Sequence, residues 1–402
     1  MEFRPILSAM LRNKTGAFLV GLQIALTLAV IANAVFIIMQ RVEKIGRPSG
    51  IDSANLIFVQ SNGFGPDYNH LDTVRRDLDL LRSIPGVVSA SSMSGIPMSG
   101  GGRSSNYGVT PDPLKHQTNV NTYDVDQNII ASLGVKLLEG RTFNEQEMQY
   151  NPNESNSDFV PSVIITQDVA KALFGDQPAL GKTIYDGLGH SAVVVGIIEN
   201  MLAAWVDYEH QAHVMLLPRT PNPPGVRYVV HTESGRADSL VPEIERKLSE
   251  ANTHRAITYV HPHSYYVERS YRSDSRMVIF LMVIIGAMIA VTALGIVGLA
   301  SFHVSVRTKQ IGTRRAVGAR RIDIIRYFMV ENWLLTTGGV VLGSILAFAF
   351  GHWLSTAYSL PRLQPIYVIS GVIVLWVLGQ LAVFMPARRA AAIPPAIATR
   401  TV

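Results

Sequence analysis

The stretch that decides the fold is MVIFLMVIIGAMIAVTALGIVGLASF, which occupies residues 277–302 and contains no charged residue. Three other long stretches are equally free of charge, at residues 16–39, 333–361 and 364–387. A helix rises about 1.5 Å per residue and the hydrocarbon core of a bilayer is about 30 Å thick, so roughly 20 apolar residues can cross it. We therefore predict four transmembrane helices, at residues 16–39, 277–302, 333–357 and 366–386.

Two other interpretations of these stretches fit less well. A buried helix of a soluble protein rarely needs more than about 14 charge-free residues. A signal peptide, the alternative for residues 16–39, has an apolar segment of about 7–15 residues followed by a cleavage site between small residues. Here the apolar run is longer and continues into the helical pattern QRVEK at residues 40–44. We expect a retained membrane anchor.

The orientation follows from the distribution of Lys and Arg. Thirteen basic residues and only three acids lie before the first helix, between the second and third, and after the fourth, whereas the short loop 358–365 holds Arg362 alone. Cytoplasmic loops carry the excess of Lys and Arg. We predict that an amphipathic segment at residues 1–15, a loop at 303–332 and a tail at 387–402 are cytoplasmic, with residues 40–276 and 358–365 outside.

The external segment differs in charge from the rest of the chain. Residues 40–276 contain 21 basic and 27 acidic residues, so the overall net charge of +5 comes from the cytoplasmic side. A protein that binds nucleic acid would concentrate basic residues on a soluble domain, so we predict no nucleic-acid partner. The chain has no cysteine. Disulfides and thiolate metal sites are therefore excluded, and the external domain must be stabilised by its own core.

The external segment has the pattern of a mixed α+β domain inserted between the first two helices. Apolar runs predict strands at 55–60, 87–91, 161–166, 191–198, 227–232 and 257–260. Helical spacing predicts helices at 69–83, 126–133, 168–174 and 237–252. This order fits two β-α-β lobes, with an insertion at about residues 125–215. We also predict that the polar residues 263–276, which lack Gly and Pro, extend the second membrane helix outward as a stalk about 20 Å long.

No motif in the chain indicates catalysis. The segment GDQPALGKT at residues 175–183 resembles a phosphate-binding loop, but five residues separate its glycines where four are needed. His210, His213, His261 and His263 have no acidic or cysteine partner at metal-ligand spacing. There is no G-x-S-x-G motif. We predict that the chain is not an enzyme and binds no metal or cofactor itself.

The membrane segments contain pairs of small residues and a few polar residues. Gly339 and Gly343 form a G-x-x-x-G pair, and Gly286 with Ala290 forms a second small-residue pair. Such pairs let helices approach closely, so we predict that they pack within or between protomers. For the polar residues we expect hydrogen bonds between helices or interfacial positions rather than a transport site; they are Gln23, Asn33, His352 and Gln380.

The cytoplasmic loop HVSVRTKQIGTRRAVGARRIDIIRYFMVEN, at residues 303–332, has two interpretations. Apolar residues at 322, 325, 328 and 329 lie on one helical face, and a basic amphipathic helix of this kind can lie on anionic lipid. Alternatively, Gly312 and Gly318 bracket a short basic helix at 313–317 that protrudes into the cytoplasm. A short protruding helix is suited to a partner's groove.

Several segments resemble MacB/FtsX-type ABC transporter permeases. KQIGTRRAVGA at 309–319, with DII at 323–325 and Glu331, resembles the segment of that family that couples to the ATPase. PARRAA at 386–391 resembles the C-terminal motif, and the family's periplasmic core is similar at 133–143, 172–175, 180–182 and 194–198. The chain departs from the pattern at Gln310, where the family usually has an acid, and near Pro394, where an acid is also missing.

This resemblance implies a bacterial inner-membrane permease that pairs with a second copy or a paralogue. A separate ATPase subunit would bind ATP and Mg, and its closure would move the stalks and rearrange the periplasmic domains. A periplasmic adaptor and an outer-membrane channel would complete an export pathway. The residues expected to contact the ATPase are Gly312, Thr313, Arg314, Arg315, Ala316, Val317, Gly318 and Ala319.

The resemblance leaves several functions open. Efflux of a periplasmic peptide, antibiotic or other small molecule is favoured by the large two-part external domain. An FtsX-like regulator of a periplasmic hydrolase and a lipoprotein-releasing permease are the alternatives with the same architecture. A membrane-anchored enzyme is disfavoured because no catalytic cluster is found in the sequence.

Overall fold

The computed structural model describes residues 14–112, 114–115, 117–150, 161–222, 225–358 and 361–394. The chain divides into a helical unit, residues 1–46 and 273–402, and an external unit, residues 47–272. The amphipathic segment predicted at residues 1–15 lies almost wholly outside the described residues, as does the tail beyond residue 394. The two units are described separately below.

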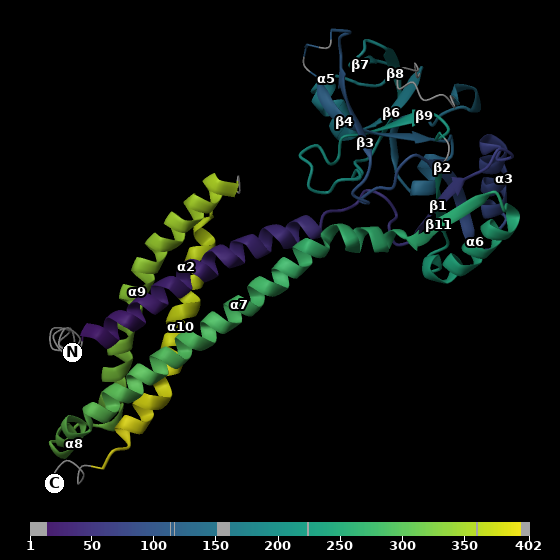
Figure 1. Cartoon of the computed structure of the whole chain (residues 1–402). Helices are drawn as coiled ribbons and strands as arrows, with labels where there is room; N and C mark the ends of the chain where they lie inside the picture. Colours follow the sequence, from purple (N-terminus) through teal and green to yellow (C-terminus); the bar gives the residue numbers. More distant parts are fainter. Residues whose placement is uncertain are drawn as a thin grey trace. The chain divides into compact units, whose positions relative to one another are not determined.

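The helical unit is built from long helices (Figure 1). They are α2 (Lys14–Ile45), α7 (His263–Val306), α9 (Arg321–Tyr358) and α10 (Pro365–Ala391), with the short α8 (Thr308–Ala316) between α7 and α9. Among the described residues, α2, α7, α9 and α10 are long and apolar enough to cross a membrane. The predicted apolar helices are therefore present, and α7 forms without a break from the polar residues predicted to extend it. Which ends face the cytoplasm remains a prediction.

The helix bounds add detail to the segments predicted to be cytoplasmic. The region predicted as a coupling loop, residues 303–332, is largely helical, because α7 continues to Val306 and α9 already begins at Arg321. The tail predicted from residue 387 is also helical at first, since α10 ends at Ala391. Hydropathy marks where charge begins, but a helix continues through charged residues as long as its backbone hydrogen bonds are satisfied.

Helix α2 lies at the centre of the helical unit, and α7 lies apart from it over most of its length. In the apolar 18-residue stretch of α2, 56% is buried within the chain, whereas in that of α7 only 6% is buried. Polar contacts join α7 to α2 at two levels, in addition to apolar packing of Ile296 and Ala300 with Val20 and Ile24. Thr27 and Thr292 share a hydrogen bond of 2.8 Å, and Asp274 accepts hydrogen bonds from Arg41 (2.8 Å) and Lys44 (2.6 Å). The exposed apolar side of α7 is thus available to lipid or to another chain.

The external unit contains one mixed sheet of eleven strands. In chain order its elements are β1 (Leu56–Gly63), α3 (His70–Arg82), β2 (Val87–Met93), β3 (Arg103–Gly108), β4 (Thr118–Val125), α4 (Ile129–Leu133), β5 (Leu137–Gly140), the 3-10 helix η1 (Glu145–Glu147), β6 (Ser162–Thr166), α5 (Gln167–Phe174), β7 (Thr183–Asp186), β8 (Ser191–Ile198), β9 (Val214–Pro218), β10 (Gly225–Thr232), α6 (Ala237–Ala251) and β11 (Arg255–Pro262).

The two predicted β-α-β units exist, but they do not form two lobes. The first is β1-α3-β2 and the second is β10-α6-β11, and their strands alternate in one antiparallel sheet of order β11-β1-β10-β2. Each unit's two strands are separated by a strand of the other unit, so neither unit could complete its hydrogen bonds alone. Helices α3 and α6 bury Leu81 and Ile244 against apolar side chains of this sheet, including Val59 and Tyr228.

The insertion between the two units is longer than the predicted 125–215. It begins after β2 ends at Met93 and ends before β10 begins at Gly225. The strands of the insertion join the four strands β11-β1-β10-β2 through a single residue pair, Met93 with Val125. The predicted helix at 126–133 is shortened to α4, which ends where Gly134 adopts a positive φ of 67°.

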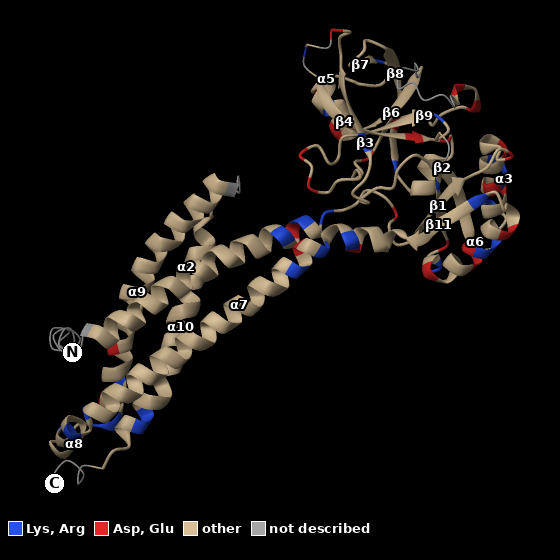
Figure 2. Ribbon diagram, in the orientation of Figure 1, with Lys and Arg blue, Asp and Glu red and all other residues tan. Residues whose placement is uncertain are grey.

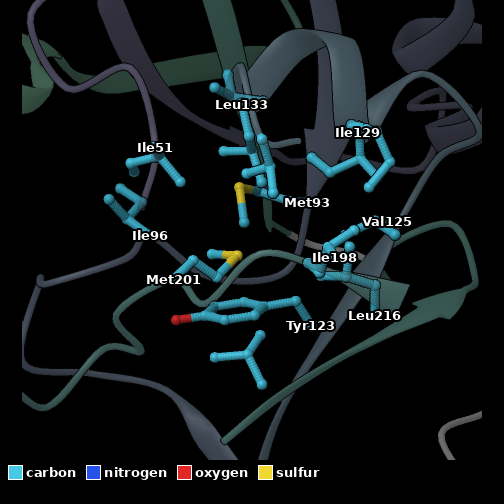
Figure 3. Packing of buried hydrophobic residues seen from close by; sticks show 14 of the residues in the cluster. Ile51, Met93, Ile96, Tyr123, Val125, Ile129, Leu133, Ile198, Met201 and Leu216 are labelled. Carbon is cyan, nitrogen blue, oxygen red and sulfur yellow. The ribbon is translucent and has the colours of Figure 1, made fainter. Parts of the chain in front are cut away.

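A buried cluster fills the space beside this junction (Figure 3). Tyr123 on β4 is 2% exposed and Met93 on β2 is fully buried, and both belong to one apolar cluster with Ile198, Met201 and Leu216. These residues come from both parts of the sheet. Because burial of apolar surface stabilises by about 25 cal/mol per Å², this cluster holds together strands that share few backbone hydrogen bonds.

Candidate ATPase-coupling site

The short helix α8 and its two flanking turns form the candidate site. The sequence predicted a helix at 313–317 bracketed by Gly312 and Gly318, but the helix begins earlier, at Thr308, and Gly312 lies inside it. The Thr308 hydroxyl donates to the carbonyl oxygens of Val304 and Ser305 at 2.9 Å, which continues the chain from α7 into α8 with little interruption. Gly312 is buried, so its missing side chain allows close packing rather than ending the helix.

The end of α8 is a well-defined glycine stop. Gly318 has a φ of 103°, a conformation that favours glycine. The Ala319 amide donates to the Arg314 carbonyl at 3.0 Å, and the Gly318 amide donates to the Arg315 carbonyl at 3.2 Å. This pair of bonds is a Schellman motif, which satisfies the last carbonyl groups of a helix. The chain then reverses, and the Asp323 carboxylate accepts a hydrogen bond of 2.9 Å from the Arg320 amide at the start of α9.

One face of α8 is anchored to neighbouring helices. Ile311 is 5% exposed and packs with Ile324 and Phe328 of α9 and with Ala387 and Ala390 of α10. Ile324 takes a buried position at the start of α9, whereas Ile322, which belongs to the predicted amphipathic face, is 61% exposed and stays available to lipid. The start of α9 therefore packs against α8 and α10 through a face rotated from the predicted one.

The opposite face of α8 is exposed. Thr313, Arg314, Ala316, Val317 and Gly318 are exposed, and Val317 is 85% exposed. Arg315 and Ala319 are half-buried. Figure 2 shows basic residues gathered around α8 and the nearby helix ends. The site thus presents an exposed aliphatic side chain beside cationic ones, on a helix whose other face is fixed.

A cluster of polar side chains connects α8 to α7 and α9. Arg307, at the junction of α7 and α8, donates to a carboxylate oxygen of Glu331 at 2.9 Å and to the hydroxyl of Tyr327 at 3.0 Å. His303 Nδ1 lies 3.4 Å from the other oxygen of Glu331. The Arg314 guanidinium lies over the Tyr327 ring, 5.3 Å from its centroid. Glu331 is 5% exposed, so this carboxylate is buried next to its cation.

Glu331 stands out in the sequence, but the cluster to which it belongs does not. A signal was present in the spacing: His303 and Arg307 are four residues apart, and so are Tyr327 and Glu331. Residues four apart lie on one helical face. One pair is cationic and the other can accept hydrogen bonds. The two pairs together therefore indicate that their helices face each other. The interpretation of Arg314 also changes, because its guanidinium already contacts an aromatic ring within the chain.

The two small-residue pairs occupy different environments. A Cβ atom added to Gly343 would lie 2.8 Å from the Ala25 carbonyl oxygen, and one added to Gly339 would lie 2.8 Å from a side-chain carbon of Ile24. Gly339 and Gly343 thus lie directly against α2 of the same chain. An added Cβ at Gly286 meets no atom within 4 Å in the part of the chain that the structure describes, and Ala290 is exposed.

The structure also places the other motifs and polar residues that the sequence singled out. The segment at 175–183 connects helix α5 to strand β7, whereas a phosphate-binding loop connects a strand to a helix. Within the described ranges, no group of three or more His, Asp or Glu side chains is placed to hold a metal. Of the polar membrane residues, Asn33 donates to the carbonyl oxygens of Ala29 and Ala347, at 2.9 Å and 3.1 Å, and so links α2 to α9.

These features define a class of protein: a membrane protein with long apolar helices, a large external α/β unit and a short basic helix between two of its apolar helices. Comparison with known proteins supports this class. The family description "MacB-like periplasmic core domain" matches residues 23–247, and "FtsX-like permease C-terminal" matches residues 282–395. The chain belongs to the MacB/FtsX-like family of ABC transporter permeases. Membership implies the inner membrane, with residues of the external unit in the periplasm.

Named relatives share modest identity with the chain. "Macrolide export ATP-binding/permease protein MacB" of Chromobacterium violaceum is 24% identical over 307 residues, which is 71% of this chain and 45% of that protein. "Probable syringafactin export ATP-binding/permease protein SyfD" of Pseudomonas syringae is 25% identical over 58% of this chain and 37% of that protein. The chain spans about half the length, or less, of the relatives it matches.

Similarity to solved structures is weak. The periplasmic region of MacB from Actinobacillus actinomycetemcomitans covers 56% of this chain and 95% of its own, with 14% identity and a TM-score of 0.35. The extracellular domain of the transporter YknZ from Gram-positive bacteria covers 50% of this chain, with 16% identity and a TM-score of 0.31.

Proposed function

We propose that this chain is the permease subunit of an ABC exporter that works by mechanotransmission. A separate ATPase subunit would hydrolyse ATP in the cytoplasm, and the chain would convert that cycle into a change of its external unit that exports a periplasmic substrate. The observation that carries this proposal is α8, a short helix with one anchored face and one exposed basic and aliphatic face. The names of the relatives, which combine ATP binding, permease and export, support it.

A path for the motion starts at the anchored face of α8. Arg307 joins the start of α8 to Glu331 of α9 at 2.9 Å, so a displacement of α8 must move α9 or break a buried ion pair. Arg307 directly follows α7, which is a single helix of 44 residues. A helix is stiff along its axis because each turn is closed by backbone hydrogen bonds. A displacement at residue 306 is therefore carried along α7 to its first residue, His263.

The exposed face of α8 suits a groove on the ATPase. Val317 would enter an apolar depression, and Arg314 and Arg315 would face acidic residues at its edge. Truncating or reversing a charge at a desolvated contact of this kind typically costs about 2–5 kcal/mol of binding free energy. The competing interpretation, in which α8 rests on anionic lipid, requires only basic charge and no specific partner.

Co-purification of the ATPase from the native host tests the proposal. Tagged full-length chain should recover a protein that mass spectrometry identifies as carrying a Walker A motif and that hydrolyses ATP. The double variant Arg314→Glu with Arg315→Glu should lose it, and Val317→Asp should weaken its recovery. A matched control is Arg75→Glu with Arg76→Glu, an adjacent and exposed pair on α3. Equal recovery with the α8 variants and the control, at unchanged folding, would refute the coupling role.

A further inference from the structure

The external unit contains a cavity of about 490 Å³ whose lining combines arginine and aromatic side chains. Every lining residue lies between residues 94 and 269, so the cavity belongs wholly to the external unit. Strands β3, β4, β10 and β11, the loop after β2 and the first turns of α7 contribute to it. Its volume falls within the range of about 300–1,000 Å³ typical of small-molecule sites.

One wall of the cavity is aromatic. The rings of Tyr259 and His261 are parallel to within 2°, with centroids 5.8 Å apart, and Tyr265 lies 4.2 Å from His261. Tyr259 and His261 are two residues apart on β11, so they point to the same side of the sheet. The Tyr259 hydroxyl donates to Gln60 Oε1 at 2.9 Å, which fixes its ring. The wall therefore has two parallel rings, Tyr259 and His261, with the Tyr265 ring tilted by 33° beside them.

The cavity also carries uncompensated positive charge. Of its three arginines, Arg103 is paired with Asp124 at 2.8 Å. Arg227 donates instead to a neutral group, the backbone carbonyl of Ser94, at 2.5 Å. Arg269 is exposed and lies in the cavity lining. None of the described residues that line the cavity is acidic.

This concentration of positive charge contrasts with its surroundings. The external segment has six more acidic than basic residues. A neighbouring cavity of about 460 Å³ includes Asp186 beside its arginines, and a third, of about 600 Å³, includes Asp67, Asp72 and Glu250. The arrangement beside the aromatic wall is thus a local feature and not a general property of the surface.

We propose that this cavity binds an organic anion, a carboxylate or a phosphate monoester, attached to an aromatic or flat apolar group. The Arg227 and Arg269 guanidinium groups would contact the anion, because their planar donor pairs match carboxylate and phosphate oxygens. The Tyr259–His261–Tyr265 wall would contact the apolar group through stacking. That such a ligand is the exported substrate rests on the proposed function; its binding does not.

Binding is tested with the full-length chain in nanodiscs of zwitterionic lipid, by equilibrium dialysis. N-acetyl-tryptophan and phenyl phosphate are the probes, and their relative affinities show which anion the site prefers. N-acetyl-tryptophan amide lacks the charge, and inorganic phosphate lacks the ring. We expect saturable binding of either aromatic anion and at least tenfold weaker binding of both controls, because a hydrogen bond to a charged group is worth about tenfold or more in affinity.

Matched variants locate the binding. Arg269→Gln should weaken it about tenfold, whereas Arg272→Gln should leave it unchanged, because Arg272 is an exposed arginine of the same helix outside the cavity lining. Tyr265→Ala, in the first turn of α7, should weaken it, and Tyr208→Ala, in the loop between β8 and β9 and outside the cavity lining, is the control. Thermal unfolding confirms that each variant is folded.

Three results would overturn the inference: no saturable binding, equal binding of the amide, or equal losses in Arg269→Gln and Arg272→Gln. Failure of this proposal is separable from failure of the proposed function. Binding without ATPase recovery would refute only the coupling role. ATPase recovery without binding would refute only the anion site.

Discussion

The buried contact between Arg307 and Glu331 makes a prediction whose size follows from the structure. The two side chains are 2.9 Å apart and only 16% and 6% exposed. Two unit charges about 4 Å apart interact by about 4 kcal/mol at an effective dielectric constant near 20. Removing one partner of such a buried pair leaves the other charge uncompensated, and typically costs about 3–5 kcal/mol.

A double-mutant cycle measures this contact. Arg307→Gln and Glu331→Gln should each lower the free energy of unfolding by about 3 kcal/mol. The double variant should be less destabilised than the sum of the two, because it leaves no unpaired charge, which gives a coupling energy of about 1–3 kcal/mol. Denaturant unfolding of the detergent-solubilised chain supplies the four values.

An exposed ion pair serves as the control. Arg246 and Glu250 are 3.0 Å apart on α6, but they are 59% and 62% exposed, so their coupling energy should be only about 0.3–0.5 kcal/mol. The same cycle, followed by ATPase recovery, shows whether the junction between α7 and α9 is needed for coupling. A coupling energy at Arg307 and Glu331 no larger than that of the control would refute the assignment of a buried, mechanically important pair.

Three further outcomes are expected. Gly343→Leu should destabilise the chain by about 1–3 kcal/mol, because a Cβ there would lie 2.8 Å from the α2 backbone. Gly338→Leu is the control and should have little effect, because a Cβ at Gly338 meets no atom within 4 Å among the described residues. Equal melting temperatures of the two variants would argue against close packing of α2 and α9. Arg141 lowers the pKa of the Glu147 carboxyl to about 2 through hydrogen bonds of 2.7 Å and 2.8 Å. Because Arg141 is 47% exposed, the pair contributes less than about 1 kcal/mol of stability, which is complete above pH 4.5 and lost as the pH falls toward 2. The stability deficit of Arg141→Gln should therefore vanish in acid, and a deficit that persists at low pH would show that Arg141 acts by packing. A cysteine placed at Gly318 in this cysteine-free chain should resist an impermeant thiol reagent applied from outside, and labelling there would reverse the predicted orientation.

The sequence anticipated the features that depend on neighbouring residues. The four long helices were found because an apolar run fixes both the helix and its length, and α7 was expected to begin near residue 263 because no Gly or Pro interrupts its polar start. Strands β6 and β8 were found in the same way, since they are short runs of Val and Ile. The glycine that stops α8, Gly318, was also recognised.

Two strands of the insertion could not be predicted from neighbouring residues. Strands β3 (RSSNYG) and β4 (TNVNTYDV) contain few apolar residues and give no alternating pattern, yet β4 pairs with β3 on one side and β9 on the other. Their other partners, β7 beside β3 and β9 beside β4, lie far away in the chain. No property of either segment alone indicates those partners.

What the sequence by itself determined is the set of local elements: the lengths of the apolar helices, the charge that distinguishes their ends, and the glycine that ends α8. The tertiary structure alone decided which elements meet. It interleaves the strands of two β-α-β units in one sheet, buries Glu331 beside Arg307, and places Arg227 and Arg269 beside one aromatic wall. The physical reason is that helix formation and hydropathy are summed over adjacent residues, whereas strand pairing, ion pairing and cavity formation depend on residues brought together only when the whole chain packs.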